Sequence, residues 1–168
     1  RYGVRTGEND TSLAAWMSGA LVAARRVNAD AVSRREPAPL VLDEGADEGC
    51  RAWLDRMTDR EFGRVGYTSR GSGAARPEER ADRFPPEQTE SMTAAGMWLR
   101  MAMGDDPPTH PLVKKGVTMC ARLRPRWTPN VGNVDLLYWY YGTLAMRRIG
   151  EPHWTAWRAA ARSALLDN

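Results

Sequence analysis

Residues 133–146, NVDLLYWYYGTLAM, constrain the fold more than any other stretch of this sequence. Four consecutive aromatic residues, Tyr138–Tyr141, stand within a run that is otherwise rich in leucine. At about 100° per residue, they point in nearly every direction around a helix. A helix that is apolar all round must be buried on most sides. The stretch therefore predicts an inner helix of a layered helical fold, with one face against an outer partner and another toward a central space.

Length and composition indicate one globular domain, residues 1–168. The sequence is 42% hydrophobic and 27% charged, and no uninterrupted apolar run approaches the roughly 18 residues of a membrane span. The net charge is only +3, and the arginines of the 60–88 segment are interspersed with carboxylates. A nucleic-acid interface would carry a more one-sided charge, so neither nucleic acid nor a membrane span is expected. The sequence does not indicate a compartment.

Apolar residues at spacings of three and four predict six helices. The first five are expected over about 10–27, 44–57, 89–103, 111–123 and 133–149, and the sixth begins near Pro152. Asn9 is the expected N-cap of the first helix. Prolines and glycines predict two irregular segments, an insertion over 30–43 and a long loop over 60–88 that folds as a lid.

The helices pair into three αα-hairpins, and the first helix of each pair resembles the others. NDTSLAAWMSGALVAA, TESMTAAGMWLRMAMG and NVDLLYWYYGTLAMRRIG share an acid near the start, then small or aromatic residues, then Leu or Met. A tandem of helical hairpins is typical of a solenoid or a closed ring.

Several segments also resemble a known family. They are RYG followed by NDTS and a Trp-containing helix, GRVGYTSRG, ESMTAAG, VDLLYWYYGTLAM and the closing ALLDN. Together they are similar to the C-terminal part of bacterial proteins with prenyltransferase and squalene-oxidase repeats, over most of the chain except about 30–43. The resemblance implies an all-α fold in which three αα-hairpins form part of an α/α-toroid, as in terpene cyclases. A complete toroid needs more hairpins, so a missing N-terminal half or a homodimer partner is expected.

The catalytic motifs of toroid enzymes are not found in the sequence. Terpene cyclases of this kind use an Asp-x-Asp-Asp acid, whereas Asp135 stands alone in VDLLY. The zinc site of a prenyltransferase β-subunit needs Asp, Cys and His ligands together. No compact ligand spacing exists among the available residues, which are Asp105, Asp106, His110, Cys120 and His153. No metal or cofactor is therefore expected, and Cys50 and Cys120 are interpreted as buried thiols.

An acid recurs at the start of each predicted inner helix, namely Asp10, Glu90 and Asp135. Carboxylates around one mouth of an α/α-barrel can act as the acid and base of a glycosidase. A simpler interpretation is that a carboxylate near a helix N-terminus is stabilised by about 0.3–1 kcal/mol through free N–H groups and the helix dipole. Both interpretations stay open, and the second is favoured.

The predicted ligand-binding surface is the aromatic concave face, formed by Trp16, Trp98, Tyr138, Trp139 and Tyr141. The preferred hypothesis is a non-catalytic or catalytically incomplete module that binds an apolar or protein ligand there. The alternative hypothesis is half of an enzyme, either terpene-cyclase-like or carbohydrate-active, with the three acids at the helix starts.

Overall fold

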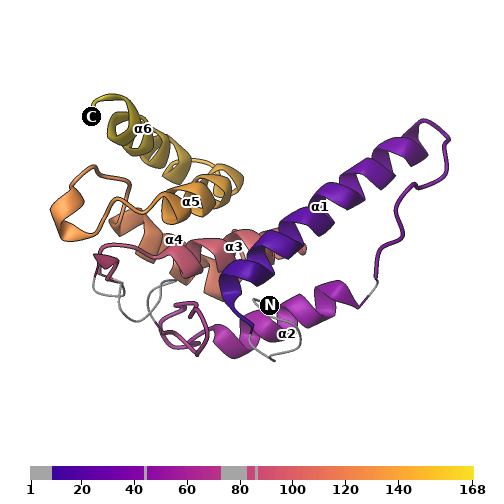
Figure 1. Cartoon of the computed structure of the whole chain (residues 1–168), viewed down its shortest axis with the longest axis horizontal. Coiled ribbons are helices and arrows are strands. Elements are labelled where there is room, and N and C mark those ends of the chain that lie inside the picture. The colour runs from indigo at the N-terminus through magenta and orange to yellow at the C-terminus, as the bar shows by residue number, and fades with distance from the viewer. Residues whose placement is uncertain (1–8, 44, 73–82, 86) are drawn as a thin grey trace.

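The computed structural model describes residues 9–43, 45–72, 83–85 and 87–168. Within that part of the chain the fold is all-helical, apart from an isolated bridge between Thr58 and Val65. The helices are α1 (Thr11–Ser33), α2 (Ala46–Met57), α3 (Ser91–Ala102), α4 (Pro111–Arg122), the short 3₁₀ helix η2 (Pro129–Val131), α5 (Leu136–Ile149) and α6 (His153–Leu166) (Figure 1).

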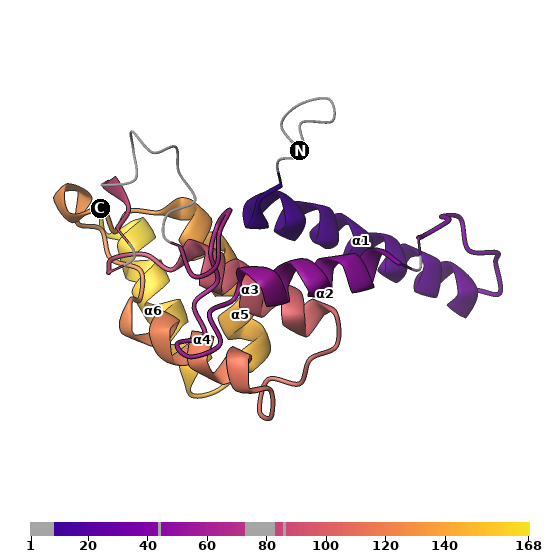
Figure 2. The same cartoon turned by 90° about the horizontal axis from the view of Figure 1, so that it is seen from below.

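The helices form three hairpins around a shared inner layer. Helix α3 lies in the middle of that layer and contacts α1 and α5, while α2, α4 and α6 pack against α1, α3 and α5 respectively (Figures 1 and 2). The predicted all-α fold of three αα-hairpins is confirmed. Closure of the hairpins into a toroid stays a prediction.

The most enclosed helix is α3 rather than the aromatic helix α5. All of α3 is buried except Trp98 and Ala102, which are partly exposed. Small residues let its neighbours approach closely: a Cβ added to Gly96 would lie 2.7 Å from the Cγ2 atom of Val65. By contrast, α5 leaves Leu136 62% and Tyr140 49% exposed. The prediction that the aromatic stretch is buried on most sides is nevertheless confirmed, because Tyr138, Trp139 and Tyr141 are all buried and only one side of α5 is exposed.

Helix α1 differs from its prediction at both ends. Asp10 rather than Asn9 is the N-cap, and its Oδ1 atom accepts the N–H of Leu13 at 2.8 Å. The helix continues to Ser33, well past the predicted end near residue 27, because the first proline of the connection is Pro37. The C-terminal half of α1 and its connection to α2 extend away from α3–α6 (Figures 1 and 2).

The first part of the predicted lid is an integral wall of the fold. Val65 is only 5% exposed and belongs to the core, and its N–H donates to the Thr93 hydroxyl of α3 at 3.2 Å. The Thr11 N–H of α1 donates to the Tyr67 carbonyl at 3.0 Å. Residues 58–72 are thus fixed across the N-terminal ends of α1 and α3. Residues 73–82 of the predicted lid lie outside the described residues, and a lid there stays a prediction.

Among the described residues, no helix has the length and apolar character needed to cross a membrane.

Candidate functional site

The three predicted acids lie at the N-terminal ends of the inner helices, and all three are buried. Asp10 precedes α1, Glu90 precedes α3 and Asp135 precedes α5, with exposed fractions of 3%, 5% and 1%. The Thr89 hydroxyl donates to Oδ2 of Asp135 at 2.8 Å and so connects the starts of α3 and α5. The starts of these two helices therefore meet at one end of the layer, as the repeated acid predicted.

Each acid has a structural task there. Asp10 caps α1, and Oδ1 of Asp135 accepts the N–H groups of Leu137 and Tyr138 at 3.0 and 3.1 Å. Oε1 of Glu90 accepts Nε and Nη2 of Arg64 at 2.9 and 2.7 Å. These contacts fit the electrostatic interpretation of the acids, in which they satisfy free N–H groups and hold a nearby cation. A catalytic role for them stays a prediction that no geometry favours.

Three of the predicted ligand-binding aromatics, Tyr138, Trp139 and Tyr141, are core residues, and two of them lie outside the cluster around α1. The Tyr138 ring meets Trp157 of α6 edge-on, with centroids 5.4 Å apart, and its hydroxyl donates to the Cys120 carbonyl at 3.2 Å. Burial, reinforced by the negative charge of neighbouring groups, raises the pKa of the Tyr138 phenol well above its usual range. Trp139 is 4% exposed and contacts Trp127 with centroids 6.2 Å apart. Neither side chain offers surface to a ligand on the concave face, which corrects that part of the predicted set.

The other aromatics do gather where α1, α3 and α5 meet. Trp16 stacks on Tyr140 with ring centroids 5.9 Å apart and an interplanar angle of 13°. Tyr141 lies beneath both rings, 6.4 Å from Trp16 and 5.1 Å from Tyr140, and Trp98 is 5.9 Å from Tyr141 on its other side. Three predicted residues, Trp16, Trp98 and Tyr141, are thus brought together.

Within this cluster only two rings present a large surface to solvent. Trp16 is 57% exposed and Tyr140 is 49% exposed, whereas Tyr141 is 1% exposed and Trp98 is half-buried. We call Trp16 and Tyr140 the inner pair. Sequence analysis missed Tyr140, although its spacing of four from Leu136 places both on one side of α5.

An apolar stripe on α1 continues the inner pair. Ala20, Ala23 and Val27 follow Trp16 at spacings of four, three and four, so all four residues lie on one side of the helix. All four are exposed. We call Trp16, Ala20, Ala23 and Val27 the α1 stripe. The sequence does not reveal this stripe, because two of its four members are alanines and add little to an apolar pattern.

No protein-family model, curated protein or solved structure matches this chain. The resemblance to prenyltransferase and squalene-oxidase repeats therefore stays a prediction, and function must be argued from the residues themselves.

The predicted zinc candidates do not assemble. His110 Nε2 lies 3.4 Å from Asp105 Oδ2, but no group of three or more His, Cys, Asp or Glu side chains in the described part of the chain could hold a metal ion. The Cys120 thiol is buried, and burial raises its pKa well above the usual value, so the reactive thiolate is disfavoured. Cys50 is half-buried, with its sulfur 3.0 Å from the Ser18 hydroxyl.

Proposed function

We propose that this protein is a non-catalytic binding module, built of helical hairpins, that packs a helix of a protein partner against the α1 stripe and the inner pair. The observation that carries the proposal is the unpartnered stack of Trp16 on Tyr140, two aromatic residues that remain about half exposed although each belongs to an inner helix. Contiguous apolar surface of this kind is typical of interaction sites.

The shape of the surface favours a helix over a small ligand. The α1 stripe runs from Trp16 to Val27, a length of about 16 Å at the helical rise of 1.5 Å per residue. Its two middle members are alanines, and small residues allow the backbone of a second helix to approach to the usual 8–10 Å between axes. The bulky inner pair at one end would supply the anchor, because aromatic side chains dominate interface energetics.

A preceding hairpin of the same repeat, or a second copy of this chain, has the required chemistry. The α1 stripe faces the same side of the inner layer as Tyr140 of α5, because Trp16 stacks on that ring. A helix of such a partner would pack across this side of α1 and α5. The enzyme alternative has no comparable support, because Asp10, Glu90 and Asp135 are engaged in caps and an ion pair.

The test is a charge placed in the middle of the stripe. Ala23→Glu changes an exposed residue, and Ala29→Glu is a matched control on the same helix, about 120° away at 100° per residue. We expect the unmodified chain to self-associate in light scattering or, as a monomer, to bind a hydrophobic dye. Ala23→Glu should abolish either behaviour, and Ala29→Glu should leave it unchanged.

Two results would overturn the proposal. One is a monomer without affinity for the dye, since such a surface would not be apolar enough to need a partner. The other is an equal response of the two variants, which would place the association elsewhere.

A further inference from the structure

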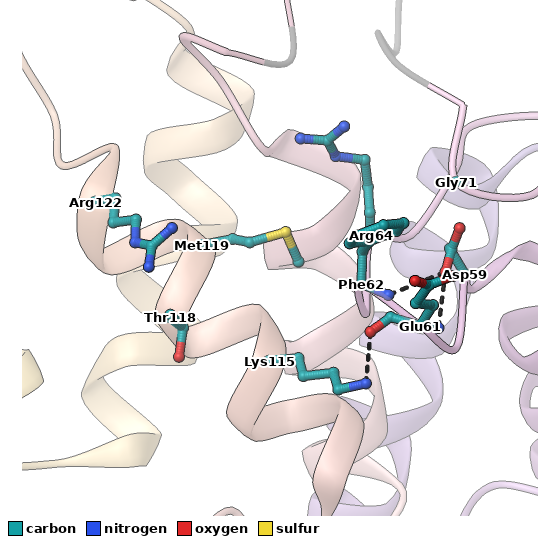
Figure 3. A pocket seen from close by; sticks show the side chains of 9 residues that line it. All are labelled: Asp59, Glu61, Phe62, Arg64, Gly71, Lys115, Thr118, Met119 and Arg122. Carbon is teal, nitrogen blue, oxygen red and sulfur yellow. Dashed lines mark hydrogen bonds between the residues drawn. The ribbon is translucent and has the colours of Figure 1, made fainter.

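A second candidate site lies away from the inner pair, in a cavity of about 510 Å³ between α4 and the loop of residues 59–64 (Figure 3). Thr118, Met119 and Arg122 line it from α4, and Phe62 and Glu61 face them from the loop. Figure 3 shows Arg122, Met119 and Lys115 reaching from α4 toward the loop. The volume is in the range of small-molecule sites, about 300–1,000 Å³.

The loop wall of this cavity is rigid. The Lys115 ammonium donates to the carbonyls of Arg60 and Glu61 at 2.9 and 2.6 Å, which fastens the loop to α4. Oδ1 of Asp59 accepts the N–H groups of Glu61 and Phe62 at 2.8 and 3.0 Å, which fixes the turn from inside. A wall held in this way loses little conformational entropy when a ligand binds.

Three cations, Arg64, Lys115 and Arg122, border the cavity, and the two arginines have guanidinium N–H groups without a partner in the described part of the chain. Arg122 is exposed and has no ion pair or hydrogen bond within the described residues. Arg64 is held by Glu90 through Nε and Nη2, so its guanidinium is oriented while Nη1 stays unused. An oriented guanidinium with free N–H groups is suited to a carboxylate or phosphate, whose oxygens accept them in a fork geometry.

The cavity also carries apolar surface. Phe62, which lines the cavity, is 64% exposed, and Met119 supplies a flexible thioether from α4. Two carboxylates are present as well, but Oδ1 of Asp59 is used by the loop backbone, and a cationic ligand at Glu61 would lie among Arg64, Lys115 and Arg122. The balance of charges favours an anion.

We infer that this cavity binds a small molecule in which an oxyanion is joined to an apolar ring or chain. Arg122 is the partner of the oxyanion, and Phe62 and Met119 contact the apolar part. A phosphate ester and a carboxylic acid share this chemistry, and the experiment separates them.

The experiment is calorimetric titration of the chain with phenyl phosphate, benzoate, inorganic phosphate and benzyl alcohol. We expect phenyl phosphate or benzoate to bind saturably, and whichever binds more tightly identifies the oxyanion. Inorganic phosphate and benzyl alcohol, which each have only one of the two features, should bind more weakly. Phe62→Ala should weaken the aromatic anion but not inorganic phosphate.

Arg122→Gln removes the proposed anion partner, and Arg126→Gln is the matched control, since Arg126 is also exposed but does not line the cavity. Arg122→Gln should weaken binding at least about tenfold, the loss expected for a hydrogen bond to a charged group. The control should change it less than about twofold, because a charge outside the cavity is screened by salt.

Three outcomes would overturn the inference. The first is that neither aromatic anion binds saturably up to about 10 mM, where the affinity would be negligible. The second is that Arg122→Gln and Arg126→Gln weaken binding equally. The third is that benzyl alcohol binds as tightly as the aromatic anions.

Discussion

Tyr138 and Tyr140 stand two residues apart on α5, yet their surroundings are opposite. Tyr138 is 1% exposed, meets Trp157 of α6 and donates its hydroxyl to the carbonyl of Cys120. Tyr140 is 49% exposed and stacks on Trp16. We call Tyr138 and Trp157 the outer pair, to be compared with the inner pair of Trp16 and Tyr140.

The difference between the pairs follows from their neighbours rather than from their chemistry. Both consist of one tyrosine and one tryptophan from two different helices, at centroid distances of 5.4 and 5.9 Å. The outer pair is enclosed between α5 and α6, with α4 against the Tyr138 hydroxyl, whereas nothing among the described residues encloses the inner pair. Aromatic area that a fold covers contributes to its stability, and aromatic area that it leaves open is available for association.

The largest effect should come from removing the tryptophan of the outer pair. Trp157 is 1% exposed, and its indole N–H donates to the Thr143 hydroxyl at 3.0 Å. Trp157→Ala should lower the free energy of unfolding by about 3–5 kcal/mol, the usual cost of truncating a buried aromatic residue. Urea unfolding followed by circular dichroism measures the change. An equal loss in Trp16→Ala would contradict the distinction between the pairs.

A smaller loss should follow from crowding the same ring. A Cβ added to Gly142 would lie 2.2 Å from the Cζ2 atom of Trp157, so the ring must move. Gly142→Ala should therefore destabilise the fold by about 1–3 kcal/mol through overpacking. Gly49→Ala in α2 is the control, because its Cβ would meet nothing within 4 Å. The control should raise the free energy of unfolding by about 0.5–1 kcal/mol, since alanine is favoured over glycine in a helix interior. Destabilisation by both substitutions would argue against the close contact between Gly142 and the Trp157 ring.

Periodic sequence patterns predicted where the helices lie but not which helix is the most deeply buried. Spacings of three and four located all six helices of the described chain, with α4 predicted to within one residue at each end. The central place of α3 was missed, because a helix enclosed on every side needs small residues such as Gly96 rather than a strong apolar stripe. The end of α1 was missed because its apolar pattern fades before the first helix-breaking residue.

The candidate site was predictable only in part for a related reason. The repeated acids were located correctly, since helix capping is a local interaction that the sequence specifies directly. Four aromatic residues in succession point in all directions, so periodicity could not separate the exposed Tyr140 from the buried Tyr138 and Trp139. That separation depends on which neighbouring helices are present, and this is a tertiary property.

The hydroxyl of the outer pair should contribute a further, smaller amount. Tyr138→Phe keeps the ring and removes the hydrogen bond to the Cys120 carbonyl, so the free energy of unfolding should fall by about 0.5–1.5 kcal/mol near neutral pH.

The same hydroxyl should make stability depend on pH. Burial raises the folded-state pKa of Tyr138, while an unfolded tyrosine ionises near pH 10. The folded state therefore keeps a proton that the unfolded state releases, and stability should fall as the pH rises above about 10. Urea unfolding across that range should show a shallower fall in Tyr138→Phe, and parallel curves would contradict the burial of the phenol.

The smallest effect concerns the inner pair itself and is measured as a coupling energy. Trp16→Ala, Tyr140→Ala and the double variant form a mutant cycle, in which the losses common to either truncation cancel. Stacked aromatic rings contribute about 0.5–1.5 kcal/mol beyond the area they bury, and solvent around this half-exposed pair should keep the coupling near the lower limit. A coupling near that limit, together with loss of self-association or dye binding in both single variants, would assign the pair to recognition. A coupling well above about 1.5 kcal/mol would show that the stack holds α1 on α5 as firmly as a core contact, and that the inner pair belongs with the outer pair as a stabilising element.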